Sequence, residues 1–286
     1  MSARRFFELD VFSAAPGQGN PLGVVLDADG LDPATMQRIA AWLNLSETTF
    51  VLPPTQPGAD YRLRIFTPAR ELPFAGHPSV GTAHAVLEAG LVPGHARRLV
   101  QECGAGLLPL RVDVTDGVRT IHVRAPRGVE RAGDASGVLA ALRGAPLGRL
   151  RPVLIDNGPR WWCVELADES VVRGLRPNLE TMAAANRADG AVGVAVYARQ
   201  AAGDFGLVVR ALVPADGIPE DPVTGSANAA IGSWLYAQDA LPARRFRASQ
   251  GREVGRDGVV EIGVDDDGEV WIGGCTQTVV TGTLHW

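Results

Sequence analysis

A nine-residue pattern occurs twice in the 286-residue chain, close to half a chain length apart. Residues 77–85 and residues 221–229 both read His or Asp, Pro, two variable residues, Gly, Ser or Thr, Ala, any residue, Ala, at a constant offset of 144. Each copy follows a β-rich run that ends in proline and precedes an alanine-rich stretch typical of a buried helix. The alternative is a chance match of Ala, Gly and Pro. The repeat favours two similar α/β halves, each with strands around its own apolar helix.

The length of 286 residues fits two domains of ordinary size. Short alternating strands separated by Asp-Gly turns follow each alanine-rich stretch. We place the boundary in the Pro-, Gly- and Arg-rich stretch 126–133. The first half is then residues 1–127, with a C-terminal strand at 277–286 returning to it, and the second half is residues 128–276.

All 27 positive side chains are arginine, and the chain has no lysine. This excludes Schiff-base chemistry on a lysine and the phosphate-binding lysine of a P-loop. The net charge of −5 is small and the arginines are spread along the chain, so we expect no nucleic-acid partner. The three cysteines are far apart, which argues against a zinc site or a disulfide framework.

No apolar run reaches the roughly 18 residues that a membrane helix needs, so we expect no membrane partner. The first ten residues contain Glu8 and Asp10, where a signal peptide would be uninterruptedly apolar. These observations predict a cytoplasmic protein.

The two copies of the repeat predict two helix starts. Proline follows both His77 and Asp221, and proline is favoured in the first turn of a helix. The sequence therefore predicts that His77 and Asp221 are cap-like residues. The free N–H groups of a helix start attract carboxylate or phosphate, so two such starts indicate an anion-binding cleft with an imidazole facing a carboxylate. The alternative for Asp221 is an ordinary capping role.

Glu47 is a third candidate. A helix is predicted over 33–43, with Asp32 as its cap, Pro33 opening it and Asn44 at its left-handed exit. Glu47 follows directly, where the helix C-terminus disfavours negative charge, and leads into a β-forming run. This position favours a functional role for Glu47. The alternative is a surface glutamate in a loop.

Other local patterns carry less information. Asn20-Pro21 is interpreted as a turn between two strands. His84 lies on the same helical face as His77, but no third ligand is near, so no metal site is predicted. Gly104-Ala-Gly106 lacks the remainder of a dinucleotide fingerprint, so no nucleotide cofactor is predicted.

Three groups of residues together resemble the PhzF-like family of phenazine-biosynthesis proteins. They are Asn44-Leu-Ser-Glu47-Thr-Thr-Phe-Val-Leu52, Phe66-Thr-Pro68 with Glu71-Leu-Pro-Phe-Ala-Gly-His77-Pro78, and Glu220-Asp221-Pro-Val-Thr-Gly-Ser226-Ala227. The resemblance runs from Asp10-Val11-Phe12 with Gly19-Asn20-Pro21 through Asn157-Gly-Pro-Arg160 to Gln250-Gly251. It implies the α+β fold of diaminopimelate epimerase, in which two pseudo-symmetric halves, each a curled sheet or barrel around a central helix, flank a cleft.

In the phenazine branch of this family the enzyme isomerises trans-2,3-dihydro-3-hydroxyanthranilate without a cofactor, by moving a proton between ring carbons on a glutamate. The resemblance implies the same cofactor-independent reaction on a small carboxylated, cyclic unsaturated substrate of phenazine or related antibiotic biosynthesis, and a homodimer. A carboxyl that removes and returns one proton must retain it, which favours a shielded group with a raised pKa. The resemblance assigns catalysis to Glu47, His77 and Asp221, and substrate binding to Gly76, Gly225, Ser226 and Asn20.

Two departures leave the substrate open. Asp221-Pro222 stands where the phenazine branch has Asp-Ala, and Trp161-Trp162 adds bulk with no assigned role. Epimerase relatives carry two cysteines at the helix starts, and His77 and Asp221 replace them here, which excludes racemisation by two thiols. An epimerase of a cyclic amino acid that uses carboxylate and imidazole stays open, as does a non-catalytic protein that binds a metabolite in the same cleft.

Overall fold

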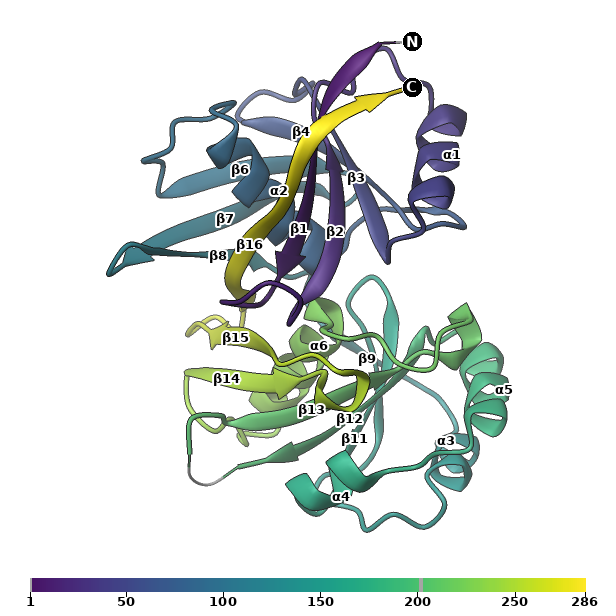
Figure 1. Cartoon of the computed structure of the whole chain (residues 1–286). Coiled ribbons are helices and arrows are strands. Elements are labelled where there is room, and N and C mark those ends of the chain that lie inside the picture. The colour runs from purple at the N-terminus through teal and green to yellow at the C-terminus, as the bar shows by residue number, and fades with distance from the viewer. Residues whose placement is uncertain (1, 201–202) are drawn as a thin grey trace. The chain divides into compact units, whose positions relative to one another are not determined.

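The computed structural model describes residues 2–200 and 203–286 (Figure 1). The chain forms two compact units. Unit 1 comprises Met1–Arg124 and Gly273–Trp286, and unit 2 comprises Ala125–Ile272. Unit 1 has strands arranged around one central helix, and unit 2 has a sheet packed on the equivalent helix of the repeat, so the α+β fold of two similar halves is confirmed. No helix within the described ranges is long and apolar enough to cross a membrane.

Unit 1 is a closed barrel of eight strands. The strands are hydrogen-bonded in the order β1-β2-β3-β4-β6-β7-β8-β16, and β16 pairs back to β1 to close the ring, while β5 pairs with β4 at the margin. The bounds are β1 (Ala3–Val11), β2 (Asn20–Val25), β3 (Glu47–Leu52), β4 (Tyr61–Phe66), β5 (Glu71–Leu72), β6 (Arg98–Cys103), β7 (Gly106–Thr115), β8 (Val118–Arg124) and β16 (Val270–His285).

Helix α2 (Gly76–Glu88) fills the interior of this barrel, and nearly all of its residues are buried (Figure 1). Small residues permit the close fit: a Cβ placed on Gly81 would lie 2.6 Å from the Leu22 side chain and 2.7 Å from that of Val11. Polar side chains fix the helix from within, because the Thr82 and Thr49 hydroxyl oxygens lie 2.9 Å apart in the buried interior. The repeat's alanine-rich stretch is thus the core of unit 1.

Helix α1 (Pro33–Leu43) packs on the outside of the barrel and confirms the predicted boundaries. The Asp32 carboxylate accepts a hydrogen bond from the Thr35 N–H at 2.8 Å, which caps the helix. Asn44 ends it in the left-handed conformation, with φ of 53°. The helix buries one apolar face against β2, β3 and β4 through a cluster of Val25, Ala28, Met36, Ile39, Ala40, Phe50 and Phe66.

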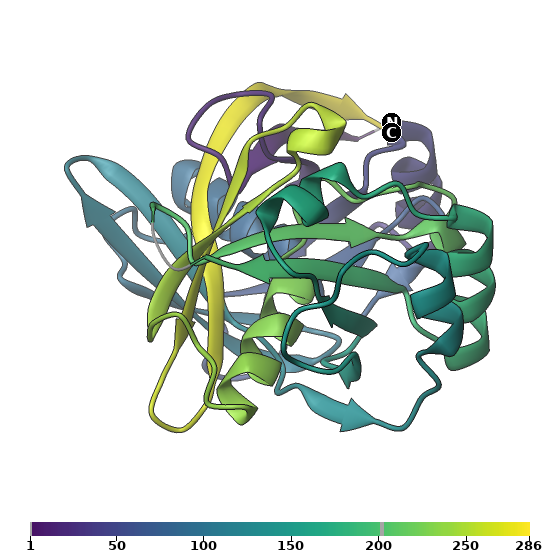
Figure 2. The same cartoon turned by 90° about the horizontal axis from the view of Figure 1, so that it is seen from below.

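Unit 2 is a sheet with helices on both faces (Figure 2). Its strands follow the order β15-β14-β13-β12-β11-β10-β9, and the first residues of β16 extend it beside β15. The strand bounds are β9 (Val129–Arg131), β10 (Val153–Asp156), β11 (Arg160–Glu165), β12 (Gly193–Arg199), β13 (Leu207–Leu212), β14 (Arg245–Gln250) and β15 (Gly258–Val264). The helices are α3 (Ser136–Ala141), α4 (Glu169–Gly174), α5 (Leu179–Asp189) and α6 (Gly225–Ala237), with short 3-10 turns η1 (Pro214–Asp216) and η2 (Arg252–Val254).

Two adjacent tryptophans show which helix covers which face of this sheet. Successive residues of a strand point to opposite faces. The Trp161 indole donates a hydrogen bond to Ser226 of α6, while the Trp162 side chain packs among residues of α3 and α5 and donates to the Asp189 carboxylate. Helix α6 therefore lies on one face, and α3 and α5 lie on the other.

The predicted helix starts are partly wrong. Pro78 lies in the first turn of α2, as predicted, but the N-cap is Ala75 and His77 is the second helical residue, not a cap. Helix α6 has Thr224 as its N-cap, so Asp221 and its proline precede the helix. The Asp221 N–H donates to the Ala211 carbonyl at 2.9 Å, which holds this residue on β13. The helix therefore begins only at Gly225.

The interpretation of Asn20-Pro21 as a turn is also wrong. Asn20 is the first residue of β2 and pairs with Val11 of β1. The turn lies just before it, because the Asp10 carboxylate accepts hydrogen bonds from the N–H groups of Gln18 and Gly19, at 2.8 and 2.9 Å. The turn between β1 and β2 therefore ends at Gly19, before the Asn20-Pro21 pair.

Candidate functional site

In unit 1 the predicted residues gather at the start of α2. Glu47 begins β3 and pairs with Leu22 of the parallel strand β2. Two residues further along β3, the Thr49 hydroxyl meets α2 inside the barrel. Since alternate residues of a strand share a face, Glu47 also points inward. The backbone of the barrel therefore aims this carboxyl at the central helix.

The carboxyl of Glu47 meets the imidazole of His77. Oε2 of Glu47 lies 3.3 Å from Nε2 of His77, and their side chains are only 16% and 6% exposed. Burial lowers the pKa of His77 from 6.5 to about 3, because a charged imidazole would lose its hydration there. His77 is therefore neutral at working pH, and the contact joins a carboxyl to a neutral ring rather than forming an ion pair. The 3.3 Å contact is a close approach of Oε2 and Nε2 without the geometry of a hydrogen bond.

Asn20 and Gly76 belong to the same end of unit 1. Gly76 is the first residue of α2 and precedes His77 directly. Asn20 is fully buried and lies two residues before Leu22, the partner of Glu47, so it faces the same side of β2. The starts of two parallel strands and of the central helix thus bring the four predicted residues of unit 1 to one end of the barrel.

The buried His77 predicts a specific dependence of stability on pH. The unfolded chain takes up a proton on this ring as the pH falls below 6.5, whereas the folded chain does not until about pH 3. The stability that is present above pH 6.5 is therefore lost between pH 6.5 and 3, at about 1.4 kcal/mol for each pH unit. Urea unfolding of His77→Gln at pH 4.5 to 7.5 is expected to show a shallower slope than the wild type, and the exposed His95→Gln control an unchanged one. An equally steep slope in His77→Gln would contradict the assignment.

In unit 2 the predicted residues surround the start of α6. The Asp221 carboxylate accepts a hydrogen bond from the Thr224 hydroxyl at 2.5 Å. Gln250 of β14, fully buried, joins three of the neighbouring groups: its carbonyl accepts from the Thr224 N–H, and its amide donates to the Thr224 hydroxyl and to the Asp221 carbonyl. This amide fixes the loop from Asp221 to the first turn of α6, including Gly225.

Ser226, the second residue of α6, is held by two side chains that sequence analysis left without a role. The Trp161 indole N–H donates to the Ser226 hydroxyl oxygen at 3.1 Å, and the Asn157 amide donates to the Ser226 carbonyl at 2.9 Å. Both residues are buried. These contacts link positions 65 and 69 residues apart, so no local pattern could have revealed them. Gln250 was visible only as part of the family pattern.

A buried ion pair holds Glu220, the residue that precedes Asp221. Arg210 of β13 and Glu220 contact each other at 2.7 Å, with side chains 7% and 4% exposed. The same guanidinium donates to the carbonyls of Val172 and Leu175 at the end of α4. Arg210 therefore joins β13, α4 and the residue that precedes Asp221.

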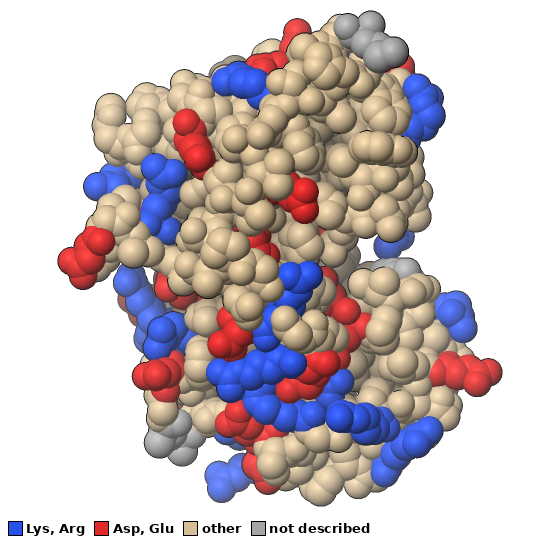
Figure 3. Space-filling model, in the orientation of Figure 1, with Lys and Arg blue, Asp and Glu red and all other residues tan. Residues whose placement is uncertain are grey.

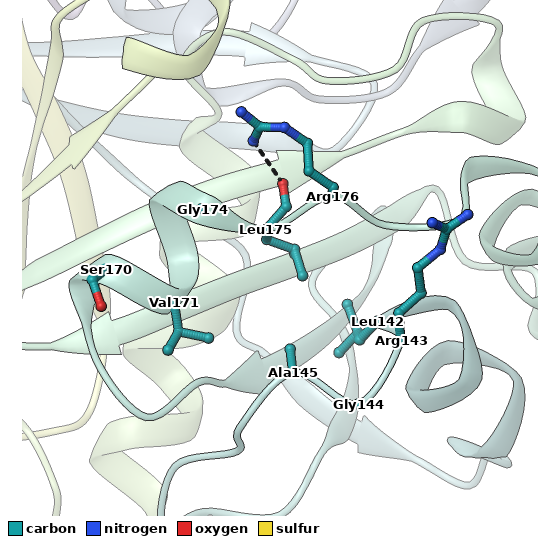
Figure 4. Close-up of a pocket in the computed structure, with 9 residues that line it drawn as sticks. All are labelled: Leu142, Arg143, Gly144, Ala145, Ser170, Val171, Gly174, Leu175 and Arg176. Atoms are coloured by element: carbon teal, nitrogen blue, oxygen red, sulfur yellow. Dashed lines mark hydrogen bonds between the residues drawn. The ribbon is translucent and has the colours of Figure 1, made fainter.

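Other surface features of unit 2 lie apart from the predicted residues. A hollow of about 420 Å³ lies between α3 and α4, with an apolar floor and two arginines at its edge, and none of the predicted residues lines it (Figure 4). Arginines also gather on the viewed face of unit 2 with acidic side chains among them (Figure 3). Ion pairs of unit 2 include Arg173 with Glu169 and Arg252 with Asp257. Within the described residues, no group of three or more metal-ligating side chains is found.

Comparisons with known proteins bear on the predicted resemblance. A protein of Schizosaccharomyces pombe named antisense-enhancing sequence 1 is 35% identical over 294 residues, covering 99% of each chain. The trans-2,3-dihydro-3-hydroxyanthranilate isomerase of Pseudomonas aeruginosa is 36% identical over 256 residues, covering 88% of this chain and 87% of that protein. Among solved structures, a phenazine biosynthesis protein of the PhzF family from Bacillus anthracis superposes with a TM-score of 0.83 at 28% identity, covering 100% of both chains.

The family model described as phenazine biosynthesis-like protein matches residues 9–282, nearly the whole chain. The match includes every residue that the sequence assigned to the site, from Asn20 to Ser226. The resemblance predicted from three motifs is confirmed: the chain belongs to the phenazine biosynthesis-like protein family.

Proposed function

We propose that this chain is an isomerase that moves a proton within a small, carboxylated, cyclic unsaturated substrate of the trans-2,3-dihydro-3-hydroxyanthranilate type, with Glu47 as the proton carrier. Family membership and the isomerase names of several relatives support the reaction class. The proposal needs no cofactor, because the substrate's own conjugation stabilises the charge that develops when the proton leaves.

The observation that carries the proposal is the contact between Glu47 and His77. A carboxyl that removes a proton from one carbon and returns it to another must keep that proton during the transfer. Only 16% of the Glu47 side chain is exposed, and its neighbour His77 is a buried, neutral imidazole. This environment restricts proton exchange between the carboxyl and solvent.

The start of α6 supplies what a carboxylated substrate needs for binding. The first N–H groups of a helix have no acceptor inside it, and Thr224, the N-cap, makes no side-chain capping bond. Partial positive charge at this end favours an anion. We propose that the substrate carboxylate binds at Gly225 and Ser226, and that Asp221 is a catalytic residue.

Proton NMR of the purified protein with trans-2,3-dihydro-3-hydroxyanthranilate in D₂O tests the proposed function. The ring signals of the substrate are expected to disappear, and the product is expected to retain part of the transferred protium. Deuterium at a single inverted stereocentre would instead support an epimerase. Binding without any change of the substrate would support a metabolite-binding protein and contradict the proposal.

A further inference from the structure

The hydroxyl group of Ser226 is constrained by chemistry as well as by position. An indole N–H is only a donor, so the Ser226 oxygen must accept the hydrogen bond from Trp161. The hydroxyl proton of Ser226 is then left to be donated elsewhere, and the described residues provide no acceptor for it. Trp161 is 3% exposed, so little water competes for this bond, while Ser226 itself is only half-buried. Ser226 therefore offers, at a half-buried position, a hydroxyl whose oxygen already accepts from Trp161.

Asn157 adds a second group that has an unused hydrogen-bond acceptor. Its Nδ2 must face Ser226, because only an N–H₂ group can donate to the serine carbonyl. Its Oδ1 is buried and makes no hydrogen bond to any described residue, although the side chain is only 2% exposed. A buried acceptor without a donor is costly, by about 1–3 kcal/mol. This acceptor lies on the same amide that grips the first turn of α6.

We propose that Trp161 and Asn157 are positioning residues that turn Ser226 into a fixed donor for the anionic group of the ligand, and that Asn157 Oδ1 accepts from an amino or hydroxyl group beside that anion. The ligand class is then a carboxylate with a hydrogen-bond donor on the neighbouring carbon. This inference rests on the proposed function, whose substrate belongs to that class, and goes beyond it by assigning recognition of the donor group.

The chain contains a matched pair of variants for the test. Trp161→Phe removes the N–H that faces Ser226, while Trp162→Phe removes an N–H that faces Asp189 on the opposite side of the sheet. Both tryptophans are almost fully buried, so the two changes disturb packing to a similar degree. A stable aromatic probe, 3-hydroxyanthranilate, carries the carboxylate and the adjacent amino group.

Calorimetric titration is expected to show about tenfold weaker binding of 3-hydroxyanthranilate to Trp161→Phe, in line with the loss of one buried hydrogen bond, and unchanged binding to Trp162→Phe. Ser226→Ala should weaken binding similarly, and the double variant with Trp161→Phe should be no weaker than Ser226→Ala alone, because Trp161 acts through Ser226. Equal binding by Trp161→Phe and the wild type, additive losses in the double variant, or no binding of the probe by the wild type would overturn the inference.

The role of Asn157 is tested by comparing the binding of two ligands. The wild type is expected to prefer 3-hydroxyanthranilate over 3-hydroxybenzoate, which lacks the amino group, and Asn157→Ala to lose this preference. An undiminished preference would refute the role of Oδ1. These binding results are independent of turnover: if the protein binds the probe through Trp161 and Asn157 yet leaves the dihydro substrate unchanged, the proposed function fails and the assignment of the two positioning residues stands.

Discussion

Glu47→Gln is expected to turn over trans-2,3-dihydro-3-hydroxyanthranilate about a thousandfold more slowly than the wild type, because the amide cannot carry a proton and general acid–base groups contribute roughly 10²–10⁴ in rate. The side chain keeps its size and its contact with His77, which lies 3.3 Å away. Binding of 3-hydroxyanthranilate should therefore remain within about threefold of the wild type, since the proposed anion site is at α6 and does not include Glu47. Initial rates from proton NMR and titration of the probe measure the two effects separately.

Glu88→Gln is the matched control for that experiment. Glu88 is also a carboxylate of unit 1 beside a histidine, 3.0 Å from His84, but it lies at the opposite end of α2. Its replacement should leave the rate unchanged. A Glu47→Gln enzyme that retains more than about a tenth of the wild-type rate would rule out Glu47 as the proton carrier.

Glu220→Gln is expected to lower the free energy of unfolding by about 3–5 kcal/mol, the usual cost of removing one partner from a buried ion pair. The change keeps the volume of the side chain but leaves the guanidinium of Arg210 buried without its counter-charge. The exposed pair of Arg252 and Asp257, with side chains 46% and 55% exposed, provides the control. Asp257→Asn should cost less than about 1 kcal/mol.

Urea unfolding followed by tryptophan fluorescence measures both variants. The double replacement Arg210→Met with Glu220→Leu should recover much of the loss, because it removes both buried charges together. A Glu220→Gln protein as stable as Asp257→Asn would show that the buried pair contributes little to unit 2.

The sequence predicted those features that short-range chemistry determines. The helix at 33–43 was identified because its cap, first proline and left-handed exit all lie within a dozen residues. The two similar halves were identified because the central helices must be small and apolar to fit inside their sheets, which leaves an alanine-rich repeat. His77 and Asp221 were first suggested by the repeat and Glu47 by its position after the helix, and the family motifs assigned their roles. Those roles stay predictions, as do the homodimer and the cytoplasmic location.

The features that the sequence could not predict depend on contacts between distant segments. Asn20 begins a strand because Asp10 closes the preceding loop, and Asp221 lies outside α6 because its N–H is held by β13. The contact of Glu47 with His77 requires the register of β3 against β2 and the placement of α2 within the barrel. The role of Trp161 depends on which face of β11 meets α6. None of these has a local signature.

The closing strand of the barrel has a consequence for biosynthesis. Residues 273–286 lie between β8 and β1, yet they are translated after the whole of unit 2. Until they emerge from the ribosome, β1 and β8 each expose an unpaired strand edge, and such edges are prone to aggregate. At about 5–20 residues per second this interval lasts on the order of ten seconds. Unit 2, which is continuous in sequence, can complete its folding first, whereas unit 1 cannot close its barrel until residues 273–286 have been synthesised.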